Sequence, residues 1–193
     1  MIVEAMNAAT RIEEWRPDPD GSDALSSDID MLADVLRAVV YDGAGVSFVV
    51  PFSIDDGRTF WRERVLPGVR AGTRRVVIAR SGRQILGTVQ IELAVPPNQQ
   101  HRAEVMKLLV HPTARRRGIA RALMVELENV ARSANRTLLT LDTWTNSHAE
   151  GLYRSLGYVV VGIIPRYARG SRTTALEPTT IMYKELVADA PSS

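Results

Sequence analysis

The chain has 193 residues, 45% of them hydrophobic and 24% charged, so it is long enough for one ordinary domain with its own core. It contains no cysteine, which excludes thiol nucleophiles, disulfides and cysteine-based zinc sites, and its three histidines lack metal-binding spacing, so no metal is expected. The formal net charge is only +2, which argues against a nucleic-acid-binding protein with a large basic surface.

The N-terminal residues show no targeting signal. They contain Glu4, Glu13 and Glu14 and no basic segment followed by an apolar one, so no signal peptide is predicted. No run of 18 or more apolar residues occurs, so no membrane span is expected either. We therefore expect a soluble cytoplasmic protein with no membrane or nucleic-acid partner. The sequence does not decide between a monomer and a homodimer.

The first part of the chain predicts a short strand, a loop and two helices. Residues 16–27 are rich in proline, aspartate, serine and glycine, which is typical of a loop. Ser27 or Asp28 is predicted to cap the first helix, because apolar residues then recur at helical spacing. Residues 43–45 (GAG) end this helix, and residues 54–70 show a second, weaker helical pattern.

Strands dominate the rest of the chain. The predicted elements, in order, are strands at residues 75–80, 85–95 and 101–110, a helix at 116–134, a strand at 138–141, a helix at 149–156, and strands at 158–164 and 179–186. A hairpin makes antiparallel neighbours, whereas the strand, helix and strand at 101–141 form a crossover that makes two strands parallel. The pattern predicts an α/β (α+β) fold with a mixed, twisted sheet.

The most informative segment is 108–120, in which an apolar strand ends at Pro112 and a tight turn opens the long helix. The first turn of a helix has unpaired amides and a positive dipole end, which suit a pyrophosphate. Four arginines would add positive charge around this turn: Arg115, Arg116, Arg117 and Arg121. A solvated arginine face is the alternative interpretation. Neither a Walker-type phosphate loop nor a dinucleotide-binding glycine turn is present.

Two sequence signatures connect this segment to a known family. Arg115, Gly118 and Ala120 form the pattern R-x-x-G-x-[GA], which resembles the acetyl-CoA motif of the GNAT N-acetyltransferase superfamily. A second signature from Asn146 to Tyr158, N-x-x-A-x-x-x-Y-x-x-x-G-Y, follows at the distance that this superfamily shows. Residues 72–186 resemble the family layout closely, and residues 10–71 resemble it loosely.

Within the superfamily the chain looks most similar to the tabtoxin-resistance type of acetyltransferase. The similar residues are 102–105, 107–108, 141–143 and 178–179. Members of that type acetylate the amine of an amino-acid-like β-lactam toxin. The resemblance implies a GNAT-like splayed sheet with helices on both faces. It divides the chain into an N-terminal strand and loop (1–25), the acetyltransferase domain (26–188) and a tail (189–193).

The resemblance also implies where acetyl-CoA binds. The pyrophosphate would lie on the amides of residues 116–121, and the pantetheine arm would follow the backbone of residues 108–110. The implied cofactor-binding residues are Leu108, Leu109, Val110, Arg115, Arg116, Arg117, Gly118, Ile119, Ala120, Arg121, Asn146 and Tyr153. Asn146 has a second interpretation as the cap of the helix that follows it.

Three residues are candidates for catalysis. By resemblance, Tyr153 donates a hydrogen bond or proton to the departing thiolate. Glu104 and Asp142 are candidate proton acceptors for the amine, because they would approach one another across the cleft. The plainer alternatives are a buried aromatic for Tyr153, a surface partner of Arg102 for Glu104, and a turn residue for Asp142. Trp144 is predicted either to line the acceptor pocket or to pack against the short helix.

The sequence thus predicts an acetyl-CoA-dependent N-acetyltransferase that acts on the primary amine of a small molecule. Attack would be direct, because no cysteine nucleophile or recognisable serine triad is present. The resemblance alone suggests an amino-acid-like toxin or antibiotic as the acceptor. Two alternatives stay open: a GNAT-fold protein that binds acetyl-CoA or a partner protein without catalysis, and a nucleic-acid-binding regulator that uses residues 115–117.

Overall fold

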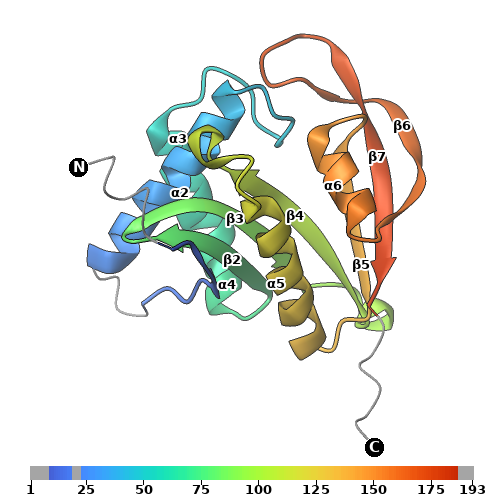
Figure 1. The fold of residues 1–193 in the computed structure, drawn as a ribbon, viewed down its shortest axis with the longest axis horizontal. Helices are drawn as coiled ribbons and strands as arrows, with labels where there is room; N and C mark the ends of the chain where they lie inside the picture. Colours follow the sequence, from blue (N-terminus) through green and yellow to red (C-terminus); the bar gives the residue numbers. More distant parts are fainter. Residues whose placement is uncertain (1–8, 19–22, 187–193) are drawn as a thin grey trace, which may run out of the picture.

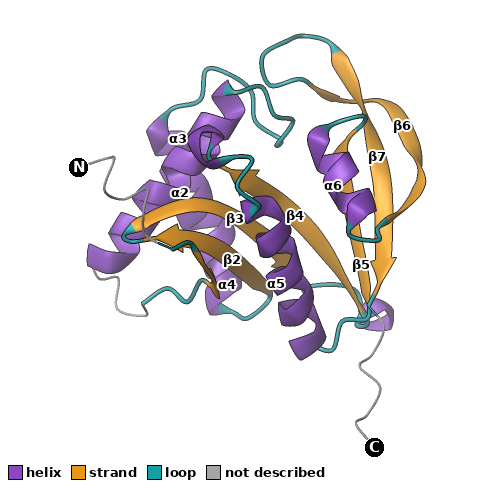
Figure 2. Cartoon of the chain, in the orientation of Figure 1, coloured by secondary structure: helices purple, strands orange, loops and turns teal. Residues whose placement is uncertain are grey.

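The computed structural model describes residues 9–18 and 23–186, which form a seven-stranded sheet with helices on both faces (Figures 1 and 2). The strands are β1 (Arg11–Glu14), β2 (Arg74–Ser81), β3 (Gln84–Glu92), β4 (Arg102–Val110), β5 (Leu138–Trp144), β6 (Val159–Arg169) and β7 (Leu176–Glu185). The helices are α2 (Asp23–Tyr41), α3 (Ile54–Thr59), the π-helix η1 (Phe60–Val65), α4 (Leu66–Arg70), α5 (Ile119–Ser133) and α6 (His148–Ser155), with short 3₁₀ turns η2 (Pro97–Gln99) and η3 (Pro112–Ala114).

The sheet is mixed, as predicted, and its order is β1-β2-β3-β4-β5-β7-β6. β4 and β5 are parallel and are joined through α5, whereas the other neighbouring pairs are antiparallel. The parallel pairing extends over only three residue pairs and ends at Glu104 and Thr140. Beyond them the two strands diverge (Figure 1). The predicted splay is therefore confirmed, and it lies at the carboxyl ends of β4 and β5.

β2 illustrates how one apolar strand supports two cores. Its side chains alternate between the two faces of the sheet. Val77 and Ala79 belong to the core beneath α5, and Val76 and Ile78 belong to the core beneath α2 and Trp61. All four are fully buried, which explains why the strand reads as a continuous apolar run.

The first helix begins earlier than its predicted caps, Ser27 and Asp28. Both residues lie inside α2, which starts at Asp23. Residue 25, the predicted end of the N-terminal strand and loop, therefore also belongs to this helix. The reason is tertiary: Leu25 is buried in the core. Asp28 accepts hydrogen bonds from Arg80 (3.0 Å) and from the indole nitrogen of Trp15 (2.9 Å), so its carboxylate links α2 to the sheet instead of capping a helix.

The long helix begins later than predicted, at Ile119 instead of residue 116. The 3₁₀ turn η3 comes first, and Arg116 and Gly118 then adopt left-handed φ angles of 59° and 78°. These backbone conformations cannot continue a right-handed helix. Gly118 is the N-cap of α5, so the turn between β4 and α5 is wider than the sequence pattern indicated.

β4 contains an irregularity at the level where the sheet splays. Gln90 of β3 pairs with Met106, but Thr88 pairs with Leu109, so one intervening residue of β3 faces two residues of β4. Lys107 is one of these two and has a φ of 54°. This is a β-bulge, which bends the strand and changes the direction of its side chains.

Candidate active site

A cavity of about 450 Å³ opens where β4 and β5 diverge. Its lining comes from five segments: residues 39–47 at the end of α2, residues 105–110 of β4, Arg115 and Ala120 around the start of α5, residues 142–144 of β5, and residues 147–153 around α6. The helix-start turn and the end of β5 therefore contribute to one cavity. We call the part beside Arg115 and Ala120 the turn end, and the part beside Asp142 and Trp144 the β5 end.

The turn end offers backbone amides to an anion. The first helical hydrogen bond of α5 runs from Ala122 N–H to the Gly118 carbonyl (3.0 Å), so residues 119–121 have no acceptor within the helix. Amides in this position, at the positive end of a fifteen-residue helix, bind phosphate groups well. The amides of residues 119–121 are thus available to an anion, and the pyrophosphate site at this turn stays a prediction.

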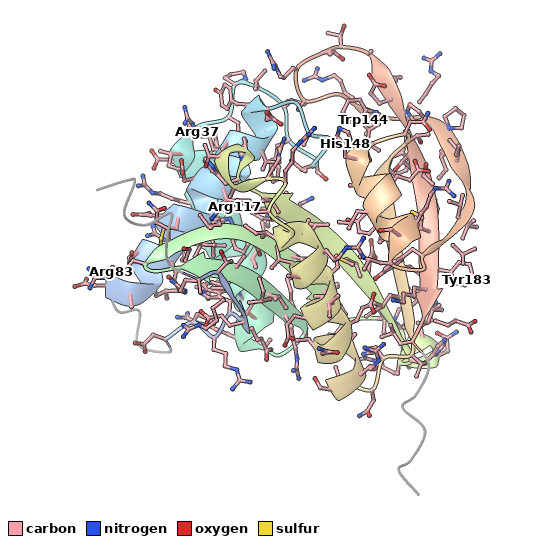
Figure 3. The ribbon with its side chains drawn as sticks, in the orientation of Figure 1. Arg37, Arg83, Arg117, Trp144, His148 and Tyr183 are labelled. Atoms are coloured by element: carbon pink, nitrogen blue, oxygen red, sulfur yellow. The ribbon has the colours of Figure 1, made fainter. Side chains whose placement is uncertain are left out.

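The arginines at this end do not all play the same part. Arg115 lines the cavity and is bound to Asp42 (2.5 Å) and to the Val110 carbonyl (3.3 Å), so it fixes the turn against α2. Arg121 donates a hydrogen bond to Ser155 (2.7 Å) and so links α5 to α6. Arg116 and Arg117 are exposed beside the turn, and Figure 3 shows Arg117 at the start of α5.

The predicted pantetheine wall, residues 108–110, lines the cavity. Leu109 is buried, whereas its two neighbours are partly exposed. Gly87 of β3 allows β4 to approach closely here, because a Cβ at this position would lie 2.7 Å from the Leu109 carbonyl oxygen. The position of the wall therefore depends on a glycine in the neighbouring strand.

Tyr153 of α6 is buried, lines the cavity and packs against Tyr158 with the ring centroids 5.6 Å apart. Burial raises the pKa of its phenol well above the usual value, and the Asp142 carboxylate raises this pKa further. The hydroxyl therefore stays protonated at neutral pH. Tyr153 is therefore suited to donate a hydrogen bond and unsuited to act as a base, and its raised pKa makes it a weaker acid than an exposed tyrosine.

α6 is held by a network that the sequence did not reveal. Its N-cap is Ser147, whose hydroxyl accepts from Glu150 N–H (3.2 Å), so the interpretation of Asn146 as the cap is wrong. Asn146 is exposed, has a φ of 60° and does not line the cavity. Its N–H donates to the buried Glu150 carboxylate (2.7 Å), which also binds Arg154 and Thr180. The described geometry thus gives Asn146 a backbone role in positioning α6.

The two candidate carboxylates lie at different depths. Asp142 lines the cavity within β5, opposite Ile181, so its interpretation as a turn residue is wrong. Glu104 pairs with Thr140, two residues before Asp142, and does not line the cavity. The proposed surface pair of Glu104 with Arg102 is also wrong, because this guanidinium binds Gln99 and Thr140. Side chains two residues apart share a face, so Glu104 and Asp142 face the same side of the sheet.

Sequence reasoning did not single out Lys107 as a site residue, yet the β-bulge places it in the cavity wall. Its ammonium donates to Ser47 (3.0 Å) and lies 5.7 Å from the ring of Phe48. Burial lowers its pKa, and the Asp142 carboxylate partly opposes this effect. A single lysine inside the apolar run Val105–Val110 was the signal that could have identified it.

A smaller cavity of about 90 Å³ adjoins the β5 end and shares Asp142 and Trp144 with the larger one. The hairpin of β6 and β7 supplies its other wall, including Tyr167, Arg169 and Glu177. Trp144 thus lines both cavities, as the first of its two interpretations predicted. Figure 3 shows it close to His148, where β5 leads into α6.

Residues 9–18 and 23–186, the described part of the chain, lack both a metal-binding cluster and a membrane-spanning helix. This part of the chain contains no group of three histidine, aspartate or glutamate side chains placed to hold a metal ion. None of its helices combines the length and the apolar character that crossing a membrane requires.

Comparison with known proteins identifies the family. A sequence profile described as the Acetyltransferase (GNAT) family matches residues 38–158, which is more than half of the chain and includes both signatures. The chain belongs to this family. GNAT proteins use acetyl-CoA, and the profile match extends from the end of α2 through the cavity-lining segments to Tyr158. The tabtoxin-resistance subtype is not confirmed.

Solved structures show the same fold at low sequence identity. An N-acetyltransferase from Staphylococcus aureus Mu50 superposes with a TM-score of 0.74 at 16% identity, over 92% of this chain and 99% of its own. The yncA protein from Salmonella typhimurium, solved with its cofactor acetyl-CoA, gives 0.71 at 17% identity over 96% and 99%. A ribosomal-protein-alanine N-acetyltransferase from Brucella melitensis gives 0.72 at 21% identity over 91% and 99%.

Proposed function

We propose that this GNAT acetyltransferase transfers an acetyl group from acetyl-CoA to the primary amine of a small molecule by direct attack. One observation carries the proposal: the anion-binding turn, the protonated Tyr153 and the Asp142 carboxylate all border one cavity. The cytoplasm stays the proposed compartment. An amino-acid-like toxin or antibiotic as acceptor is supported only by the similarity of short segments to the tabtoxin-resistance type.

At the turn end, residues of the chain hold the pyrophosphate. The amides of residues 119–121 donate to it, and Arg116 and Arg117 add positive charge beside the turn. Residues 108–110 then guide the pantetheine arm along the wall of the cavity. This arrangement directs the thioester toward the β5 end, where Tyr153 and Asp142 lie.

At the β5 end, Asp142 binds the acceptor ammonium and takes its proton, directly or through water, with Glu104 as a further acceptor on the same face. The neutral nitrogen then forms a bond to the acetyl carbon and loses its second proton to solvent through water. The carbon–sulfur bond breaks, and its electron pair stays on sulfur. Tyr153 donates its proton to the thiolate and regains one from solvent. Positioning of the two reactants supplies most of the acceleration.

Two alternatives receive less support. A catalytically silent binder of acetyl-CoA or of a partner protein would not need a protonated tyrosine and a carboxylate at the same cavity, and this chain has both. A nucleic-acid-binding regulator would need a broad basic surface, whereas two of the clustered arginines, Arg115 and Arg121, are engaged within the protein.

A thiol-release assay with acetyl-CoA and a panel of primary amines tests the proposal. Tyr153→Phe is expected to lower kcat roughly 100-fold, the lower range for loss of a general acid, with little change in acetyl-CoA affinity by calorimetry. Tyr183→Phe is the matched control, because Tyr183 lies on β7 away from the cavity (Figure 3). Unchanged turnover in Tyr153→Phe would refute the acid role. Binding of acetyl-CoA without thiol release for any amine would favour the silent binder.

A further inference from the structure

The β5 end contains two opposite charges that do not pair with each other. The Lys107 ammonium and the Asp142 carboxylate both line the large cavity, one on β4 and the other on β5. They are close enough for the carboxylate to influence the lysine electrostatically, yet they form no ion pair within 4.0 Å. Each is instead held by a neutral hydroxyl.

Lys107 is fixed in place without being neutralised. Its ammonium has three donors, and the described contacts are one hydrogen bond to Ser47 (3.0 Å) and the face of Phe48 (5.7 Å). No carboxylate of the described residues lies within 4.0 Å of it. A half-buried cation with donors to spare is stabilised by an anion that enters the cavity.

Asp142 is fixed in a similar way. The Thr179 hydroxyl lies 3.0 Å from one carboxylate oxygen and shares its single hydrogen between this oxygen and the Thr143 carbonyl (2.9 Å). No side-chain cation among the described residues lies within 4.0 Å of Asp142. The neighbouring small cavity adds a second carboxylate, Glu177, two aromatic side chains, Trp144 and Tyr167, and one cation, Arg169. An ammonium group is well suited to this combination of carboxylates and aromatic faces.

We propose that the acceptor is a zwitterion, an amine that carries a carboxylate or similar acidic group nearby, and that Lys107 binds the acidic group while Asp142 binds the ammonium. This inference rests on the proposed acetyl transfer and specifies its acceptor class. Lys107 is then the residue that selects acidic acceptors, and the β-bulge of β4 is what directs it into the cavity. An acceptor bound at both groups presents its amine in one orientation.

The kinetic test compares acceptors that differ only in charge. Glycine, β-alanine, leucine, methionine, phenylalanine and glutamate are assayed beside their amides. The wild type is expected to prefer the acids roughly tenfold or more in kcat/KM, as for loss of a charged hydrogen bond. Lys107→Met should abolish this preference, and Lys107→Arg should retain part of it. Equal use of acids and amides by the wild type, or a preference that survives Lys107→Met, would overturn the proposal.

The ratio of acids to amides makes this test independent of general damage. A variant with a distorted β4 would lose both acceptor types equally, which contradicts a selective role. Acetyl-CoA affinity is measured by calorimetry in parallel. A loss of this affinity with an unchanged ratio would assign Lys107 to the cofactor and overturn the proposal.

A chemical readout separates this inference from the proposed function. The sequence contains only two lysines, and Lys184 is paired with Glu128 (2.7 Å), so reductive methylation followed by mass spectrometry can report on Lys107. The acids should protect Lys107 in the wild type and their amides should not. Protection without thiol release would support the zwitterion site and contradict acetyl transfer. Thiol release without selective protection would support acetyl transfer and overturn the zwitterion site.

Discussion

The two ends of the cavity are built in different ways. The turn end uses backbone amides from one continuous segment, residues 112–121. The Gly118 carbonyl in this segment accepts the first helical hydrogen bond of α5. The β5 end uses side chains from segments far apart in the chain: Ser47 after α2, Lys107 on β4 and Asp142 on β5, with Glu177 on β7 in the adjoining small cavity.

The two ends therefore differ in how strongly they depend on the identity of their side chains. Backbone amides at a helix start bind a diphosphate whatever side chains surround them, so many sequences can build the turn end. The β5 end depends on the identity of individual side chains. Under the proposed function, substitutions there would change the acceptor without disturbing the cofactor site, in keeping with the many functions that one fold can carry.

The largest expected effect would break the turn end alone. Gly118→Glu should weaken acetyl-CoA binding at least roughly 100-fold, because it places a carboxylate beside the diphosphate and a side chain on a left-handed backbone. Calorimetry measures the loss. Gly82→Glu is the matched control: Gly82 also has a positive φ and open space around it, but it lies in the hairpin turn of β2 and β3. Equal loss in both variants would contradict the assignment.

A smaller effect should separate the β5 end from the turn end. Asp142→Asn is expected to raise KM for the amine roughly 30-fold, as for the loss of a charged hydrogen-bond partner, and to lower kcat because the proton acceptor is lost, with acetyl-CoA affinity unchanged. Steady-state kinetics and calorimetry together check this. Glu104→Gln, on the same face but outside the cavity wall, should have the milder effect. A larger effect from Glu104→Gln would make that residue the main proton acceptor.

The smallest effect concerns the coupling of Tyr153 to its surroundings. Burial raises the pKa of both Tyr153 and Tyr158, so these two tyrosines should ionise above the usual pH of about 10 in an alkaline absorbance titration. Tyrosines in the unfolded chain lose their protons at about pH 10. Above this pH the native state binds more protons than the unfolded state, so the free energy of unfolding falls as pH rises further. In Asp142→Asn the pKa of Tyr153 should decrease, because a nearby negative charge is removed. Ionisation of Tyr153 at the usual pH of an exposed tyrosine would contradict its burial as a proton-bearing group.

The sequence predicted the fold and the turn end because both depend on local patterns. The period of apolar residues identified the hairpin of β2 and β3, and the strand, helix and strand from β4 to β5 implied the parallel pair. Helix limits were less accurate. α2 includes the residues predicted to cap it because Leu25 packs into the core, and α5 starts late because Arg116 and Gly118 adopt left-handed conformations.

What the sequence determined by itself is the family, the sheet and the segment proposed to bind the diphosphate, since contiguous residues carry that information. Only the tertiary structure determined which side chains meet at the β5 end. The β-bulge at Lys107 and the hydrogen bonds of Ser47 and Thr179 depend on contacts between residues far apart in the chain. No local sequence pattern encodes such contacts, because the contacting residues lie in separate segments. They approach one another only in the folded chain, where β4 and β5 diverge and the loop after α2 packs beside them.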